Sequence, residues 1–103
     1  MNTRVPYLYR DANNHKTGGS VVVEGTLDES QVAVIRESLD EGVYFIPEHV
    51  GLPALRPSAT TEADHPWHEI RLERLEATGD PATHGTAASL VERFRHAEWS
   101  AVG

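Results

Sequence analysis

Apolar and polar side chains alternate in the first quarter of the chain. In residues 5–10 (VPYLYR), three apolar side chains share one side of an extended segment, as a half-buried strand requires. The stretch 11–19 is rich in Asn and Gly, which favour a tight reversal. Residues 20–27 (SVVVEGTL) carry the β-branched side chains that suit a second strand. The pattern predicts a β-hairpin.

The apolar period then changes to that of an amphipathic helix. Residues 28–41 (DESQVAVIRESLDE) place their apolar side chains along one helical stripe. Asp28 is a preferred residue type before the first turn, and Gln31 completes a capping box with it. Gly42 is expected to end the helix, because glycine readily adopts the left-handed conformation that follows a last turn.

Two more strands and a long loop are predicted next. Residues 43–47 (VYFIP) are continuously apolar, which favours a central strand covered on both faces. Residues 47–66 contain four of the six prolines and form a long Pro-rich loop, a kind of segment that often carries function. Residues 67–78 (WHEIRLERLEAT) contain good helix formers, but the alternation of Ile70 and Leu72 favours a strand with a bulge near Arg74.

The chain closes with a second amphipathic helix over residues 86–99, with Trp99 anchoring its end. The predicted order is therefore β-β-α-β-β-α. At 103 residues the chain forms one domain, 1–103, with an α+β fold in which the helices pack on one face of a mostly antiparallel sheet. β-Grasp domains have a similar order, but that analogy concerns the fold and carries no function.

Composition narrows the functional classes. The chain has no cysteine, which excludes disulfides, thiolate metal sites and cysteine nucleophiles and agrees with a reducing cytoplasm. Its first residues lack the apolar core of a signal peptide, and no run is long enough to span a membrane, so a cytoplasmic protein without membrane contact is expected. The net charge of −7 argues against a nucleic acid partner.

Acidic residues are concentrated between Glu24 and Glu48, where seven acids accompany a single base, Arg36. The simplest interpretation is a solvated surface that promotes solubility. The alternative is a surface that docks on another protein with a basic surface. In that case the expected partner-binding residues are Asp40, Glu41, Tyr44, Glu48 and Trp67.

Residues 64–69 (DHPWHE) form the densest group of functional side-chain types. Pro66 disfavours a helix through this segment, so His65 and His68 lack the shared helical face of a zinc motif, and neither a metal site nor a cofactor is expected. His68 and Glu69 are adjacent in the sequence, so in an extended chain their side chains point to opposite sides. This argues against the two acting together as an acid–base pair. The structural alternative is that His68 donates a hydrogen bond that stabilises the fold.

A second polar segment, residues 10–16 (RDANNHK), is either a hairpin loop or one half of a ligand site. The ligand site of this alternative comprises Arg10, Asp11, His15, Lys16, His65, His68 and Glu69. Its basic side chains suit an anion or an acidic peptide. Its histidines and carboxylates leave a small enzyme open, including a metal-assisted one.

Three segments, YRDANNHK, YFIPEHVGLP and DHPWHE, resemble those of a group of small uncharacterised bacterial proteins. The resemblance implies that the three segments belong together, and it implies no activity. The sequence therefore favours a non-enzymatic, cytosolic protein–protein interaction module, such as an adaptor, an inhibitor or an immunity-type partner. A small ligand-binding domain or enzyme is the alternative.

Overall fold

A computed structural model of the chain describes residues 1–10, 15–55, 67–97 and 99. The predicted hairpin is present: β1 (Asn2–Arg10) pairs antiparallel with β2 (Lys16–Val23), from Thr3 opposite Val23 to Arg10 opposite Lys16. Val5, Tyr7 and Tyr9 lie on one face of β1 and are almost completely buried, whereas Arg4, Pro6 and Arg10 on the other face are half-buried. The three buried side chains define the covered face of the sheet.

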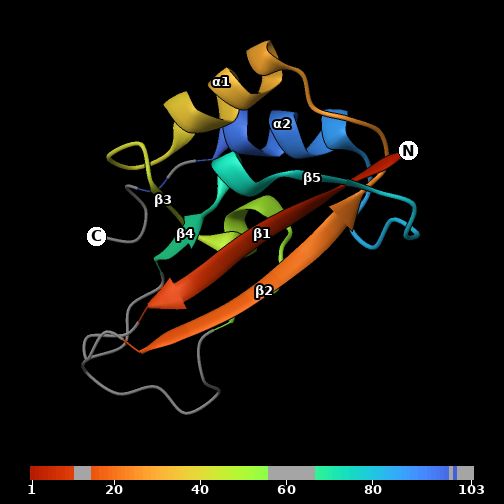
Figure 1. The fold of residues 1–103 in the computed structure, drawn as a ribbon. Helices are drawn as coiled ribbons and strands as arrows, with labels where there is room; N and C mark the ends of the chain where they lie inside the picture. Colours follow the sequence, from red (N-terminus) through yellow and green to blue (C-terminus); the bar gives the residue numbers. More distant parts are fainter. Residues whose placement is uncertain (11–14, 56–66, 98, 100–103) are drawn as a thin grey trace.

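Three shorter strands complete the sheet. They are β3 (Tyr44–Phe45), β4 (His68–Ile70) and β5 (Glu76–Thr78). The strand order is β2-β1-β4-β3, β5 also pairs with β1, and every pairing is antiparallel. Both helices, α1 (Glu29–Ser38) and α2 (Ala87–His96), lie on one side of this sheet (Figure 1). The predicted α+β class is therefore confirmed, and the predicted order β-β-α-β-β-α is met except that a fifth strand, β5, precedes the last helix.

The expectation that residues 43–47 form a central strand is wrong. β3 has two residues and lies at the edge of the sheet, where β4 is its one partner among the described strands. Its apolar run has another cause: Phe45 packs against the ring of Phe94 in α2, with ring centroids 5.5 Å apart. Ile46 is then buried as the chain turns into the short 3-10 helix η1 (Pro47–Val50).

Residues 67–78 form two strands instead of one bulged strand. β4 and β5 both pair with β1, and the 3-10 turn η2 (Leu72–Arg74) separates them. The break lies opposite Pro6 of β1, whose carbonyl accepts a hydrogen bond from the N–H of Arg71 at 3.0 Å. Proline has no N–H to return to the ladder, so the pairing is interrupted there.

α1 begins as the sequence predicts and ends earlier. The carboxylate of Asp28 accepts from the N–H of Gln31 at 2.8 Å, and the Gln31 side chain accepts from the N–H of Asp28 at 2.9 Å, which completes the capping box. The helix ends at Ser38, so the expectation that Gly42 ends it is wrong. Gly42 lies instead in the turn before β3, with a φ of 73°.

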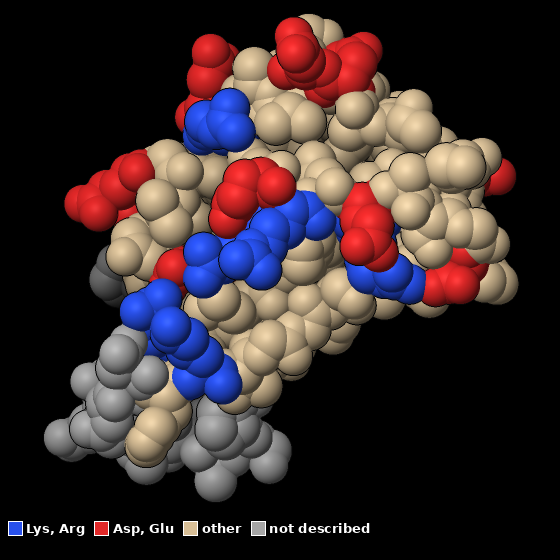
Figure 2. All heavy atoms as spheres, in the orientation of Figure 1, with Lys and Arg blue, Asp and Glu red and all other residues tan. Residues whose placement is uncertain are grey.

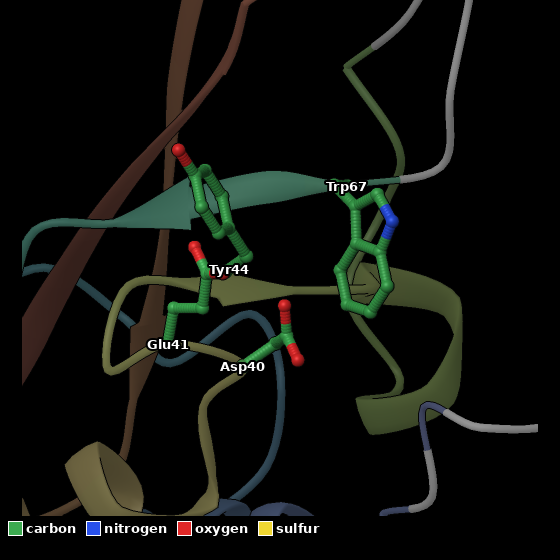
Figure 3. Close-up of a pocket in the computed structure, with 4 residues that line it drawn as sticks. All are labelled: Asp40, Glu41, Tyr44 and Trp67. Carbon is green, nitrogen blue, oxygen red and sulfur yellow. The ribbon is translucent and has the colours of Figure 1, made fainter.

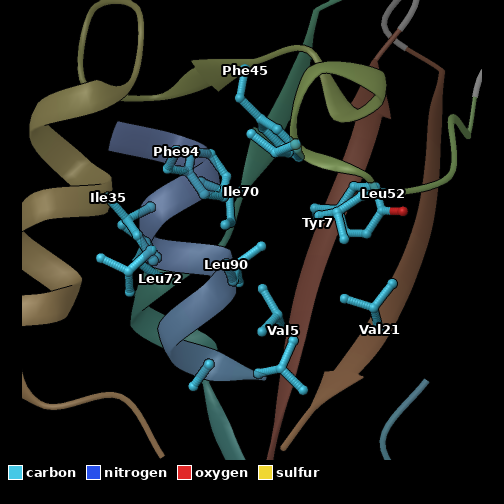
Figure 4. Close-up of a cluster of buried hydrophobic side chains, with 14 of the residues drawn as sticks. Val5, Tyr7, Val21, Ile35, Phe45, Leu52, Ile70, Leu72, Leu90 and Phe94 are labelled. Atoms are coloured by element: carbon cyan, nitrogen blue, oxygen red, sulfur yellow. The ribbon is translucent and has the colours of Figure 1, made fainter. Parts of the chain in front are cut away.

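The hydrophobic core fills the space between the sheet and the helices (Figure 4). The rings of Tyr7 and Phe45 meet edge to face with centroids 5.6 Å apart. Val50 and Leu52, which follow β3, are also buried in this core. In the part of the chain that the structure describes, no helix is long and apolar enough to cross a membrane.

Candidate functional site

Four of the described side chains line a pocket of about 270 Å³ at the edge of the sheet. They are Asp40, Glu41, Tyr44 and Trp67. The two acids lie in the turn after α1, Tyr44 lies in β3, and Trp67 directly precedes β4. In Figure 3 the Asp40 carboxylate projects into the space between the two rings, and Glu41 points from the turn toward Tyr44. Two carboxylates and two aromatic rings therefore share one concave surface.

A closed backbone turn presents the two carboxylates. Asp40 and Tyr44 exchange backbone hydrogen bonds of 2.9 Å in both directions, which fixes the ends of the turn. Glu41 has a φ of 53°, in the left-handed region where a side chain costs about 1–2 kcal/mol. Glycine would avoid that cost at position 41. The turn therefore keeps a carboxylate where backbone geometry favours glycine.

A second tryptophan supports the Trp67 wall of the pocket. The rings of Trp67 and Trp99 meet edge to face with centroids 6.1 Å apart, and His49 lies on Trp99 at 5.9 Å. The indole N–H of Trp99 donates to the carbonyl of Ser38 at 2.7 Å. Trp99 thus anchors the segment after α2, as expected. No local sequence pattern indicated that Trp99 and His49 would support this pocket.

The two carboxylates of the pocket, those of Asp40 and Glu41, are exposed and have no ion-pair partner among the described residues. By contrast, Arg4 of β1 forms ion pairs with Glu76 and Asp80. Asp40 and Glu41 therefore keep their full negative charge available to a cationic partner.

The acidic stretch of the sequence is not one patch in space. Figure 2 shows acidic side chains in separate groups over α1 and near the turn before β3, with basic side chains in a band across the strands. The ten residues of α1 span about 15 Å between Glu29 and the turn at Asp40. This exceeds the screening length of about 8 Å at physiological salt, so the two groups act largely independently.

Glu48, the fifth residue expected to bind a partner, is not among the residues that line this pocket. It lies in η1, exposed, and close enough to Tyr7 to affect its ionisation. Burial of the phenol, reinforced by the negative charge of Glu48, raises the pKa of Tyr7 to about 12. The Tyr7 hydroxyl donates to the carbonyl of Pro53 at 2.6 Å.

His68, a residue of the alternative ligand site, is completely buried. It lies on the covered face of β4, next to the ring of Tyr9 at 5.1 Å. Its Nε2 accepts a hydrogen bond of 3.0 Å from the N–H of Leu55, so this nitrogen has a structural role as an acceptor. Glu69 points to the other face, as the alternation of a strand requires.

The other described residues of that alternative site do not gather around His68. Arg10 and Glu69 form an ion pair of 3.0 Å on the open face of the sheet. His15 and Lys16 are exposed at the start of β2. Asp11 and His65 lie outside the described residues. Among the residues that the structure describes, no cluster of three His, Asp or Glu side chains could hold a metal ion.

No protein-family model, curated protein or solved structure matches this chain. The function has to be inferred from the site itself.

Proposed function

We propose that this protein is a non-enzymatic cytoplasmic interaction module that binds another protein with a basic surface. An adaptor, an inhibitor or an immunity-type partner would act in this way. One observation carries the proposal: Asp40, Glu41 and Tyr44 of the turn that leads into β3 line the same pocket as Trp67, which is distant in the sequence. Their two carboxylates lack ion-pair partners among the described residues.

The chemistry of the pocket suits recognition of a protein surface. Exposed carboxylates at a rim attract a basic partner and accelerate its encounter. Tyr and Trp are the residue types that most often supply the binding energy at the centre of an interface. The left-handed conformation of Glu41 supports the same interpretation, since residues with unfavourable backbone conformations are concentrated at functional sites.

The alternative of a small enzyme or a ligand-binding domain has weaker support. Its central histidine, His68, is buried with Nε2 engaged by Leu55, and Arg10 is paired with Glu69. These contacts give the three side chains roles in the stability of the sheet. They leave the pocket at the sheet edge as the better supported site.

Two matched double variants test the proposal. Asp40→Asn/Glu41→Gln removes both carboxylates of the pocket. Glu24→Gln/Glu29→Gln removes the same charge outside the pocket, directly after β2 and at the start of α1. The wild-type protein, immobilised, is expected to retain a specific partner from a cell extract at about 0.05 M salt and to release it at about 0.5 M. The pocket variant should lose that partner, and the control variant should keep it.

Equal loss in both variants would mean that overall charge, and not the pocket, attracts the partner. A partner that survives both substitutions and high salt would contradict the proposal. Circular dichroism of each variant tests whether the fold is unchanged. An unchanged fold is expected because the four substituted side chains, those of Glu24, Glu29, Asp40 and Glu41, are all exposed.

A further inference from the structure

Building on the proposed function, we infer that the pocket receives a single arginine side chain of the partner, with its guanidinium group between Tyr44 and Trp67. The size of the pocket is the first argument. Its volume of about 270 Å³ lies just below the range of about 300–1,000 Å³ typical of small-molecule sites. One long side chain inserted from a protein surface suits this space better than a free metabolite.

The two rings define the chemical class of the occupant. A cation over the face of Trp or Tyr gains about 0.5–1 kcal/mol at an exposed site and more when it loses water. Tyr44 and Trp67 are both half-buried, so a group that enters between them exchanges water for aromatic surface. The two carboxylates would repel an anion, and a neutral polar group would gain less from the rings and the carboxylates than a cation does.

Arginine suits a pocket lined by two aromatic rings and two carboxylates better than lysine does. A guanidinium group is planar and weakly hydrated, so its face can lie on an aromatic ring while its edge donates to a carboxylate. Asp40 extends between the two rings in Figure 3, where it can accept two parallel hydrogen bonds from that edge. A lysine ammonium is compact and strongly hydrated, and it cannot stack and form a bidentate contact at once.

The charge balance also agrees with one arginine. Asp40 and Glu41 together present two negative charges, and neither is neutralised by another described residue. One guanidinium group in contact with Asp40 leaves Glu41 free to attract a second basic residue beside the first. The preferred sequence on the partner is therefore an arginine flanked by further positive charge.

Three capped tripeptides test the inference: Ac-Gly-Arg-Gly-NH2, the same peptide with lysine, and the same peptide with citrulline, which has the shape of arginine without the charge. Each is titrated into ¹⁵N-labelled protein by NMR. The arginine peptide is expected to shift the Trp67 indole N–H and the Asp40 and Glu41 amides. Lysine should bind about three- to tenfold more weakly and citrulline should not saturate.

Substitutions in the protein complete the test. Asp40→Asn/Glu41→Gln and Tyr44→Ala should each weaken arginine binding about three- to tenfold, and Glu24→Gln/Glu29→Gln should leave it unchanged. Equal affinity for the arginine and lysine peptides would overturn arginine recognition while leaving an acidic docking surface intact. Arginine binding whose shifts map away from Trp67 would overturn the pocket. Failure of the proposed function shows separately, as retention of the cellular partner by the Asp40/Glu41 variant.

Discussion

His68 fills a space between aromatic rings on the covered face of the sheet. Its ring centroid lies 5.1 Å from that of Tyr9, 6.1 Å from that of Tyr7 and 6.2 Å from that of Phe45. Because its Nε2 accepts the N–H of Leu55, this nitrogen carries no proton in the folded protein. At this single position, a residue type associated with catalysis fixes the segment after η1 to the sheet.

Two substitutions at His68 separate packing from hydrogen bonding. His68→Phe keeps an aromatic ring but leaves the N–H of Leu55 without its acceptor, which should cost about 1–3 kcal/mol. His68→Ala also removes the ring and should cost about 3–5 kcal/mol. Urea unfolding followed by circular dichroism measures both free energies. A folded His68→Phe protein of wild-type stability that had lost partner binding would instead assign this histidine to the binding site.

At the scale of elements, Trp99 joins α1, η1 and the entrance of β4. The last carbonyls of a helix have no partner within the helix, and the Trp99 indole satisfies that of Ser38. The same ring contacts His49 and Trp67. The segment after α2 therefore supports the aromatic wall of the pocket from behind.

Trp99→Phe and Trp99→Ala test this support and leave Trp67 as the only tryptophan in the chain. Trp99→Phe keeps a ring against Trp67 and should lose only the hydrogen bond to Ser38, about 0.5–1.5 kcal/mol. Trp99→Ala removes the ring, so Trp67 should become more solvated. Its fluorescence should then shift to longer wavelength than in Trp99→Phe, and the arginine peptide should bind more weakly. Identical spectra and affinities in the two variants would show that Trp99 does not position Trp67.

The elements that could be predicted from the sequence are those with local signals. Asp28 and Gln31 are three residues apart and form the capping box directly. The division of residues 67–78 into β4 and β5 depends instead on Pro6, in a strand far away in the sequence. The edge position of β3 likewise depends on which strands pair with each other in the sheet. A short apolar run in the sequence does not determine that pairing.

The candidate site was predictable as a set of residues and not as a shape. The concentration of acidic residues and the presence of aromatic residues that occur at interfaces indicated Asp40, Glu41, Tyr44 and Trp67 as partner-binding residues. The fold brings these four residues together. Their convergence requires β3 to pair with β4, which brings residues 44 and 67 to one edge. Glu48 shared the same charge signal but follows the chain into η1, away from the pocket lining.

At the scale of the whole molecule, Tyr7 connects the centre of the sheet to the segment after η1. Its ring lies in the core and its hydroxyl donates to the carbonyl of Pro53 at 2.6 Å. Tyr7 can ionise to the phenolate only if its hydrogen bond to Pro53 breaks within the folded protein or if the protein unfolds. The pKa of about 12 in the folded state, against about 10 in an unfolded chain, expresses this preference for the neutral phenol.

The raised pKa of Tyr7 predicts alkaline destabilisation with a defined sign. Below about pH 10 the phenol is protonated in both states and has no effect on the pH dependence of stability. Between about pH 10 and 12 the unfolded chain releases this proton while the folded chain keeps it, so the free energy of unfolding should fall by about 2 kcal/mol.

Tyr7→Phe should be less stable near neutral pH, because it lacks the bond to Pro53, yet lose less stability as the pH rises. Urea unfolding at about pH 8 and about pH 11.5 measures the difference, and the other ionisable groups cancel between the two proteins. Parallel losses of stability in the wild type and in Tyr7→Phe would contradict the assignment to Tyr7.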